Sequence, residues 1–328
     1  MRSEDEEIKL DASARPLAGQ TLRLDQIRES SFAGLTALAV LGWPIRHSVS
    51  PQMHNAALAE LARKNERFAN WRYYRVEVEP ENLKAALELL AEKGFAGLNL
   101  TIPHKVLALE HVEIAEDDWN GLASGAVNTL YRFGNGWRGT NTDGIGLLLG
   151  LMEAPTYASI RGRDVILVGA GGAARAIGAS CLISGCRSLY VGNRSADRLE
   201  ELLKQLEPLN QTGNLHGFDL KDSLHTPLPS SPVVINATSL GLKPDDPCPL
   251  DLAAFEAGTV VFDTTYGKHR SKLVEQAQSY GFAASNGLPM LVNQGAKALA
   301  LWTGFDEGLP PEVIARMYCA AREALGLS

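Results

Sequence analysis

The sequence predicts an α/β protein of two domains, and three observations carry this prediction. The chain has 328 residues, whereas one domain usually contains about 100–200. Two stretches alternate apolar strand patterns with helical patterns, which is typical of mostly parallel sheets covered by helices. A glycine-rich turn joins the first strand of the second stretch to the helix after it.

The first alternation begins at Thr36. The run TALAVLG predicts a buried strand, and Ser50 followed by Pro51 predicts a helix with serine as its N-cap. The pattern continues with a strand over 73–78, a helix over 81–93 and a strand over 95–100. Residues 1–34 are polar and lack sustained periodicity, so we expect an N-terminal extension that is partly disordered or lies against the surface.

The second alternation begins near Asp164, where the turn GAGGAA follows an apolar strand and opens a helix. Gly169 allows the tight turn, Gly171 lets the backbone approach a pyrophosphate, and free N–H groups at the helix start attract the anion. The pattern predicts a Rossmann-type dinucleotide site rather than only a tight turn. Its candidate cofactor-binding residues are Gly169, Ala170, Gly171, Gly172 and Ala173.

Further elements complete this second unit. They are a helix ending near Gly185, strands over 188–193, 233–238, 259–266 and 282–285, and helices over 196–206 and 272–280. Two final helices, over 290–301 and 311–325, have no strand after them, so we expect them to pack on the first domain. The predicted boundaries are an extension over 1–34, a substrate-binding domain over 35–142 and 287–328, and a nucleotide-binding domain over 143–286, with the active-site cleft between the two domains.

The cofactor type is indicated at the end of the strand over 188–193. An NAD site usually has Asp or Glu there to accept hydrogen bonds from the ribose 2′-hydroxyl. Here the residues are Asn193, Arg194 and Ser195. A guanidinium fork suits a 2′-phosphate, and a hydroxyl can add to it, so the sequence favours NADP. The alternative is that Arg194 only covers the edge of the sheet.

Composition narrows the function classes. The net charge of −7 argues against a nucleic-acid partner. Apolar runs are shorter than the ~20 residues of a membrane helix, and the N-terminus is not of the secretory kind. The four cysteines form no C-x-x-C pair, and no His or Cys spacing suggests a metal, so we expect buried thiols and a cytoplasmic protein. The sequence leaves monomer and homodimer open.

Polar residues gather in four segments of the first half, at predicted strand ends. The segments are GWPIRHSVSP (42–51), NLTIPHK (99–105), GAVNT (125–129) and NTDG (141–144). In open α/β sheets, ligands bind at the carboxyl ends of the strands. Hydroxyls, amides, a lysine and an aspartate that converge there suit a small ligand with several hydroxyls and a carboxylate. Each segment alone could be a capped turn, but four together favour a site.

These segments resemble the signature blocks of the shikimate dehydrogenase family, in order from about Leu41 to Gly304. Matching blocks are G-x-P-I-x-H-S-x-S-P-x-x-H-N from Gly42, N-x-T-x-P-x-K from Asn99, G-A-V-N-T, N-T-D-G, G-A-G-G-A-A-R, Asn193-Arg194, N-A-T-S from Asn236, and the region from Gln294 to Gly304. The resemblance implies reversible NADPH-dependent reduction of 3-dehydroshikimate to shikimate in aromatic amino-acid biosynthesis.

The same resemblance implies roles for single residues. It makes Lys105 and Asp143 the catalytic pair and places Ser48, Ser50 and Tyr266 at the substrate carboxylate. It assigns the ring hydroxyls to Asn99, Thr101, Asn128 and Gln294, and adds Thr238 and Gly287 to the cofactor residues. Lys105 could donate a proton to the developing alkoxide or only stabilise it, and the sequence leaves this open. For His47, His54 and His104 we expect structural roles.

Three departures from the family pattern stand near the expected site. GKHRS follows Tyr266 where proline and threonine are frequent, Gly295 replaces a common alanine, and Leu242 replaces a common methionine. Two alternatives remain: a quinate/shikimate dehydrogenase that uses NAD, and a protein that binds NADP without catalysis. The Ser48-x-Ser50 pair favours shikimate over quinate, and intact Lys105 and Asp143 favour an enzyme.

Overall fold

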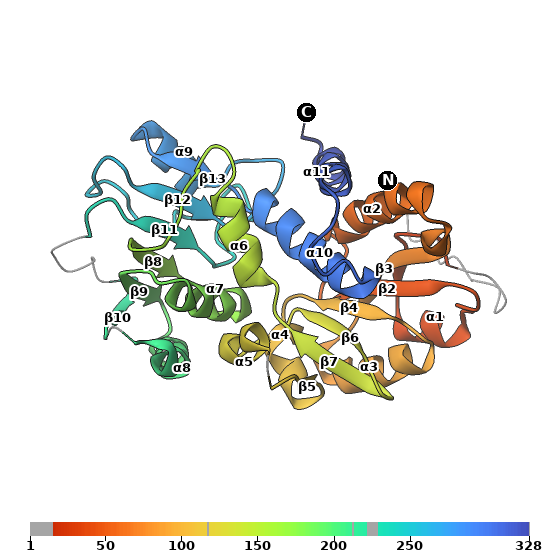
Figure 1. Cartoon of the computed structure of the whole chain (residues 1–328). Coiled ribbons are helices and arrows are strands. Elements are labelled where there is room, and N and C mark those ends of the chain that lie inside the picture. The colour runs from red at the N-terminus through yellow and green to blue at the C-terminus, as the bar shows by residue number, and fades with distance from the viewer. Residues whose placement is uncertain (1–15, 117, 212, 222–228, 328) are drawn as a thin grey trace, which may run out of the picture.

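The structure is a computed structural model that describes residues 16–116, 118–211, 213–221 and 229–327. Its strands form two sheets, which lie on either side of helices α6 (Asp143–Leu151) and α10 (Leu288–Thr303) (Figure 1). The predicted α/β class with two parallel-rich sheets is confirmed.

The first sheet has seven strands. They are β1 (Thr21–Leu22), β2 (Thr36–Gly42), β3 (Trp71–Glu77), β4 (Gly97–Leu100), β5 (Glu113–Ile114), β6 (Thr129–Phe133) and β7 (Gly136–Thr140). Their order is β1-β3-β2-β4-β6-β7-β5. The β1 to β4 pairs are parallel, whereas β6 is antiparallel to both β4 and β7. The β6–β7 hairpin, which the sequence did not predict, turns at Gly134 with φ +56°.

Strand β2 is buried on both faces because helices cover the sheet on both sides. Leu38 and Val40 join a core with α2 (Ser50–Lys64), α10 and α11 (Pro311–Leu325). Ala39 and Leu41 join a second core with α1 (Leu24–Glu29) and α3 (Leu83–Glu92). The last two helices therefore pack on the first sheet, as predicted.

The expectation of a separate extension over 1–34 is wrong for residues 16–34. Strand β1 pairs with β3, and Leu22 and Ile27 are completely buried. A strand of two residues and a helix of six are too short to show periodicity in the sequence. Residues 1–15 lie outside the described part of the chain.

The second sheet has six parallel strands. They are β8 (Asp164–Val168), β9 (Ser188–Asn193), β10 (Leu215–Asp219), β11 (Val233–Asn236), β12 (Val260–Asp263) and β13 (Ala283–Ser285), and helices α7 (Gly172–Ile183), α8 (Ala196–Leu206) and α9 (Lys272–Ser279) complete the unit. The order β10-β9-β8-β11-β12-β13 is that of a Rossmann sheet. The sequence missed β10, since this edge strand is only partly buried.

Short helices fill the connections. They are α4 (His104–Leu107), α5 (Trp119–Ser124) and 3-10 turns at Glu66–Phe68, Pro80–Asn82, Ala108–Glu110 and Glu207–Leu209. Helix α5 connects β5 and β6 of the first sheet, but it packs against α7, which belongs to the second unit. There Gln205 Nε2 donates to the Ala123 carbonyl at 3.0 Å, and Arg175 Nη1 donates to Gln205 Oε1 at 2.8 Å.

Helices α6 and α10 approach closely at Gly146. A Cβ at this position would lie 2.7 Å from Gln294 Cβ, which real side chains do not allow. Gly146 therefore permits the contact that brings the start of α6 and the middle of α10 together. Asp143 stands at that start, and Gln294 at that part of α10.

Candidate active site

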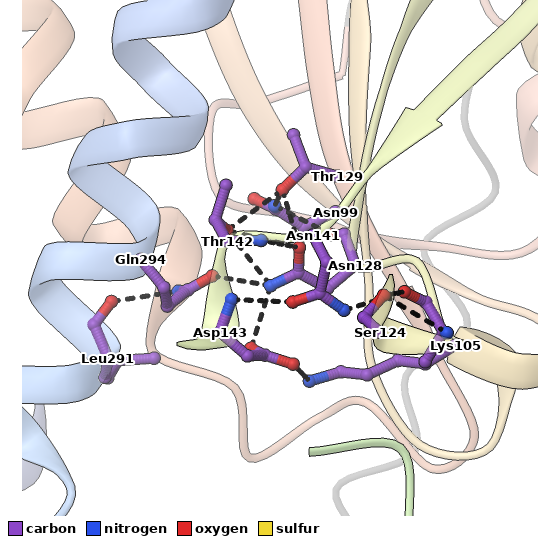
Figure 2. Close-up of polar contacts among 11 residues, drawn as sticks. Asn99, Lys105, Ser124, Asn128, Thr129, Asn141, Thr142, Asp143, Leu291 and Gln294 are labelled. Atoms are coloured by element: carbon purple, nitrogen blue, oxygen red, sulfur yellow. Dashed lines mark hydrogen bonds and ion pairs between the residues drawn. The ribbon is translucent and has the colours of Figure 1, made fainter. Parts of the chain in front are cut away.

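Lys105 and Asp143 form the centre of a polar cluster near the carboxyl ends of β2 and β4. Lys105 Nζ donates to Asp143 Oδ2 at 2.6 Å, and Figure 2 shows the lysine chain reaching across to the carboxylate. The side chains are 15% and 4% exposed, respectively. Such burial shields the pair from the screening that weakens surface ion pairs.

Asn128 connects this pair to the rest of the cluster. Its Nδ2 donates to Asp143 Oδ1 at 2.8 Å and to Thr142 Oγ1 at 3.0 Å. Its Oδ1 accepts from the Thr142 backbone N–H at 2.8 Å and from Thr129 Oγ1 at 3.0 Å. The side chain of Asn141 accepts the Asp143 N–H at 2.9 Å. Both carboxylate oxygens of Asp143 are thus held in fixed directions.

Gln294 reaches the cluster from α10. Its Oε1 lies 3.4 Å from Asn128 Nδ2, which is long for a hydrogen bond, and its Nε2 donates to the Leu291 carbonyl at 2.9 Å (Figure 2). The long contact is the weakest link of the network. A ligand hydroxyl could replace it at little cost.

The side chain of Asn99 is oriented by its neighbours. Its Nδ2 donates to the Asn128 carbonyl at 3.0 Å and to Thr129 Oγ1 at 3.1 Å, and Tyr73 OH donates to its Oδ1 at 2.7 Å. Burial raises the pKa of Tyr73 far above its usual value, so this group stays a protonated donor. Since both amide hydrogens of Asn99 are engaged, its remaining capacity is to accept a hydrogen bond.

Ser48 and Ser50 lie together at the start of α2. Ser48 Oγ accepts the Ser50 N–H at 3.3 Å. The predicted N-cap is wrong by one residue, because the helix begins at Ser50 and its N-cap is Val49. The Ser48 hydroxyl takes up the N–H of Ser50 from two residues away, which leaves Ser50 free to adopt helical geometry.

Two predicted substrate residues stand apart from the hydrogen-bonded cluster. Among the described residues, the Thr101 hydroxyl has no partner, although the Thr101 N–H donates to the Leu41 carbonyl at 2.9 Å. Tyr266 follows β12 and packs against the core that contains Val49 and Met53, next to the start of α2. Burial raises the pKa of its phenol.

The glycine-rich turn has the geometry expected of a pyrophosphate loop. Gly169 has φ +117°, and a Cβ there would lie 3.0 Å from the Ala237 carbonyl oxygen. A Cβ on Gly171 would meet no atom within 4 Å. Gly171 therefore borders open space at the N-terminus of α7, where an anion fits. Ala170 is buried and Ala173 packs on the core of the second sheet.

This turn also lies beside Lys105. A Cβ on Gly172 would lie 3.1 Å from Lys105 Cβ. Glycine thus lets the turn approach the lysine from the second sheet. A cofactor on the turn and a substrate at Lys105 would share one site.

The predicted 2′-phosphate residues stand at the end of β9, whose last residue is Asn193. Arg194 and Ser195 are exposed, and Asn193 Nδ2 donates to the Ser195 carbonyl at 2.9 Å. Ser195 Oγ accepts the Arg198 N–H as the N-cap of α8. The structure leaves the Arg194 guanidinium accessible to a ligand.

Thr238 follows β11, and Gly287 is the N-cap of α10. Thr238 Oγ1 donates to Asn236 Oδ1 at 2.7 Å, and Asn236 Nδ2 donates to the buried Asp263 at 2.9 Å. Gly287 is required by close packing, because a Cβ there would lie 2.0 Å from the Thr264 carbonyl oxygen. Thr238 also lies beside the glycine-rich turn, since a Cβ on Gly169 would lie 3.0 Å from its Cγ2.

Two of the three histidines expected to have structural roles, His54 and His104, are buried and contact backbone carbonyls. His54 Nδ1 contacts the Ser50 carbonyl at 2.9 Å and its ring stacks on Tyr73 with centroids 4.1 Å apart. Burial lowers the pKa of His54 to about 4. His104 Nε2 contacts the Val78 carbonyl at 2.9 Å, and burial lowers its pKa also. His47 is exposed.

Packing accounts for one departure from the family pattern. A Cβ on Gly295 would lie 2.5 Å from Met53 Cε and 3.1 Å from His54 Cε1, so glycine fits these neighbours. In the GKHRS segment, His269 Nε2 contacts the Gly241 carbonyl at 3.1 Å and Ser271 caps α9. Leu242 is half exposed.

The expectation of buried thiols is met only in part. Cys181 and Cys186 are buried, but Cys248 is only partly buried and Cys319 is exposed, so buried thiols describe two of the four. In the described ranges, no three His, Cys, Asp or Glu side chains cluster as metal ligands. None of the helices in this part of the chain has the length and apolar character to cross a membrane.

The sequence did not single out Tyr73, Thr129, Asn141 and Thr142 as site residues. Asn141 and Thr142 belong to the NTDG segment, and Thr129 ends GAVNT, so those segments carried a signal. Tyr73 had none, since its contact with Asn99 is long-range.

A Rossmann sheet beside a buried lysine–carboxylate pair defines an oxidoreductase that uses a dinucleotide.

Comparisons with known proteins agree with this class. Residues 40–130 match the family model for the shikimate dehydrogenase substrate binding domain, and residues 287–306 match that for the shikimate 5'-dehydrogenase C-terminal domain. A shikimate dehydrogenase (NADP(+)) of Methanopyrus kandleri is 37% identical over 86% of this chain and 94% of its own length.

Two solved structures are similar in fold. A shikimate dehydrogenase in complex with NADP+ has a TM-score of 0.77 and 30% identity, over 94% of this chain and 99% of that chain. The enzyme of Thermus thermophilus, in complex with NADP(H) and shikimate, has a TM-score of 0.72 and 31% identity, over 89% of this chain and 100% of that chain. The chain belongs to the shikimate dehydrogenase family.

Proposed function

We propose that the protein catalyses the reversible NADPH-dependent reduction of 3-dehydroshikimate to shikimate, a step of aromatic amino-acid biosynthesis. The observation that carries the proposal is the Lys105 Nζ–Asp143 Oδ2 contact of 2.6 Å, buried beside the glycine-rich turn. It combines a proton donor with the place where a dinucleotide would enter.

The catalytic pair acts on the oxygen of the substrate ketone. NADPH, when bound at the glycine-rich turn, would supply the hydride to the carbonyl carbon. Lys105 Nζ donates a hydrogen bond, and then a proton, to the oxygen as negative charge develops on it, which typically accelerates a reaction by about 10²–10⁴-fold. Asp143 orients the lysine, and Asn128 holds the second carboxylate oxygen at 2.8 Å. In the reverse direction the same groups receive the proton.

The remaining polar residues orient the substrate. Its carboxylate would bind at Ser48, Ser50 and Tyr266, and its ring hydroxyls at Asn99, Thr101, Asn128 and Gln294. Asn99 Oδ1 would accept from a hydroxyl because both of its amide hydrogens already have partners. A hydroxyl near Asn128 would replace the 3.4 Å contact with Gln294.

The cofactor residues fit NADP. The open space at Gly171 and the N-terminus of α7 would hold the pyrophosphate, with Gly169, Ala170, Gly172 and Ala173 shaping the turn. Arg194, with Asn193 and Ser195, would bind the 2′-phosphate. Thr238 and Gly287 would border the nicotinamide half.

We also propose that the protein acts in the cytoplasm, as a monomer or a homodimer.

The test is a four-way assay that follows the absorbance of reduced nicotinamide. Shikimate and quinate are each offered with NADP and with NAD. We expect fast turnover only with shikimate and NADP. Strong turnover of quinate with NAD would instead identify a quinate/shikimate dehydrogenase. Tight NADP binding with no turnover of either acid would identify a protein that binds the cofactor without catalysis.

A further inference from the structure

Arg75 is a buried guanidinium behind the serine loop. It lies on β3 and is 9% exposed. Its Nε donates to the Ser48 carbonyl at 2.8 Å, its Nη1 to the Gly19 carbonyl at 2.7 Å, and its Nη2 to Gln52 Oε1 at 2.8 Å. All three acceptors are neutral, so the hydrogen bonds do not compensate the positive charge.

No carboxylate oxygen of a described residue lies within 4.0 Å of this guanidinium. The carboxylate nearest along β3, that of Glu77, instead lies 3.9 Å from Arg46 Nε. By contrast, Arg138 and Arg175 are more exposed and each has a carboxylate partner. Tyr73 is an ionisable group that interacts with Arg75, but burial raises its pKa, so its phenol stays protonated and uncharged. A buried charge without a counter-ion is costly, so such groups usually have a partner.

One of the three acceptors that Arg75 binds is the backbone carbonyl of Ser48 in the serine loop. The hydroxyls of Ser48 and Ser50 are neutral, yet the proposed substrate presents a carboxylate to them. Arg46 cannot supply the missing charge as well, because its side chain is 65% exposed to solvent and leans toward Glu77. Arg75 supplies positive potential from the protein side of the same loop, where water does not screen it.

We propose that Arg75 is a specificity-determining positioning residue that selects an anionic substrate by placing a buried positive charge behind the Ser48–Ser50 loop. This inference rests on the proposed function. Arg75 does not touch the substrate. It fixes the Ser48 carbonyl and stabilises the bound carboxylate at longer range, and the substrate thereby becomes its counter-ion.

The segment before β2 completes this arrangement. The Gly19 N–H donates to the Tyr73 carbonyl, and the Arg75 N–H donates to the Gln20 carbonyl, each at 3.0 Å. Strand β1 continues the pairing along β3. Gly19 and Gln20 thus accept hydrogen bonds from the side chain and the backbone of Arg75, which links the N-terminal segment to the proposed substrate site.

The test compares Arg75→Met and Arg75→Lys with a matched control, Arg163→Met. Arg163 is also partly buried and donates to the backbone carbonyls of Ser231 at 2.5 Å and Gly258 at 2.8 Å, but it stands directly before β8 of the second sheet. It reports the loss of a structural arginine far from the serine loop. Steady-state kinetics are measured with shikimate and with its uncharged methyl ester.

We expect Arg75→Met to raise the KM for shikimate about 10-fold to 50-fold, with kcat and the KM for NADP nearly unchanged. The KM for the methyl ester should change much less, because the ester carries no charge. Arg75→Lys should recover most of the affinity, and Arg163→Met should leave every KM unchanged. Should Arg75→Met not fold, Arg75→Gln takes its place with the same expectation.

Equal increases in KM for shikimate and for the ester would overturn the inference, since they would assign Arg75 a purely structural role. A failure of Arg75→Lys to recover affinity would do the same. Wild-type protein that turns over no shikimate with NADP would overturn the proposed function itself. If the wild type turns over shikimate and the KM values of Arg75→Met equal those of the wild type, only the inference about Arg75 would be overturned.

Discussion

Asp143 accepts hydrogen bonds on both carboxylate oxygens, from Lys105 Nζ at 2.6 Å and from Asn128 Nδ2 at 2.8 Å. Lys105 lies in α4, which follows β4 of the first sheet. Asp143 is the first residue of α6, which leads to the second sheet. The contact therefore joins the substrate side of the site to the element that carries the chain toward the nucleotide side.

Replacing Lys105 with methionine should lower kcat by about 10²–10⁴-fold, because the variant keeps the shape of the side chain but lacks the proton donor. Asp143→Asn should also lower kcat, since the lysine loses its orienting carboxylate. Fluorescence titration should show unchanged NADPH binding. The matched control is Lys93→Met, whose ammonium only contacts the carbonyls of Arg28 and Ser30. If Lys105→Met kept full activity while His104→Asn lost it, the assignment of Lys105 as the proton donor would be wrong.

Arg194→Gln should raise the KM for NADP by about 10-fold or more, because hydrogen bonds between charged groups contribute about 1.5–3 kcal/mol. The KM for NAD, which lacks the 2′-phosphate, should change little, so NAD is the internal control. Equal losses with both cofactors would show that Arg194 only covers the sheet edge.

Gly171→Ala should weaken NADP binding far more than it lowers the free energy of unfolding. The added methyl group meets no protein atom within 4 Å, so the loss of stability should be limited to the difference between glycine and alanine as the N-cap of α7. Gly136→Ala is the control, since it also adds a methyl group in open space, but on the β6–β7 hairpin. Thermal unfolding and NADPH titration measure the two effects. Unchanged cofactor affinity in Gly171→Ala would place the pyrophosphate elsewhere.

The stability of the protein should fall as the pH drops from about 6.5 to 4, and His54 should account for part of the loss. Burial lowers the pKa of His54 from 6.5 to about 4 in the folded protein. In this window the unfolded chain binds the proton and the folded chain does not, so protonation favours unfolding by up to about 3 kcal/mol. Denaturant unfolding at each pH measures the effect.

The control for this titration is His54→Asn, which retains an N–H donor near the Ser50 carbonyl but cannot titrate. Carboxylates contribute to the pH dependence of both proteins, so the comparison isolates the histidine. Identical slopes for wild type and His54→Asn between pH 6.5 and 4 would show that His54 does not titrate in this way.

Regular elements were predictable where the sequence pattern is long. The helices over 196–206 and 311–325 and the strand over 188–193 have the predicted bounds. Their periodicity arises from burial of one face or of both, and that signal is local. Strands β1, β5, β6, β7 and β10 were missed, because they are short, lie at or near a sheet edge, or flank a turn whose residues carry no periodic signal.

The residues of the site divide in the same way. Lys105, Asp143, Asn128 and the glycines of the turn stand in contiguous segments whose chemistry is visible in the chain. Tyr73 and Arg75 act through contacts with Asn99, Ser48 and Gly19, which lie 26, 27 and 56 residues away. Nothing in their local sequence distinguishes them from other residues of a buried strand.

The sequence by itself determined the α/β class, the dinucleotide turn and the preference for NADP, and its resemblance to a known family implied the pairing of Lys105 with Asp143. The class and the turn depend on the order of neighbouring residues, which local sterics and hydrogen bonding translate directly into strands, helices and a turn. Only the tertiary structure decided that the segment before β2 belongs to the first sheet, that Gly172 lies against Lys105, and that Arg75 lies buried behind the serine loop. Those relationships depend on which distant surfaces exclude water together, and that is a property of the folded chain.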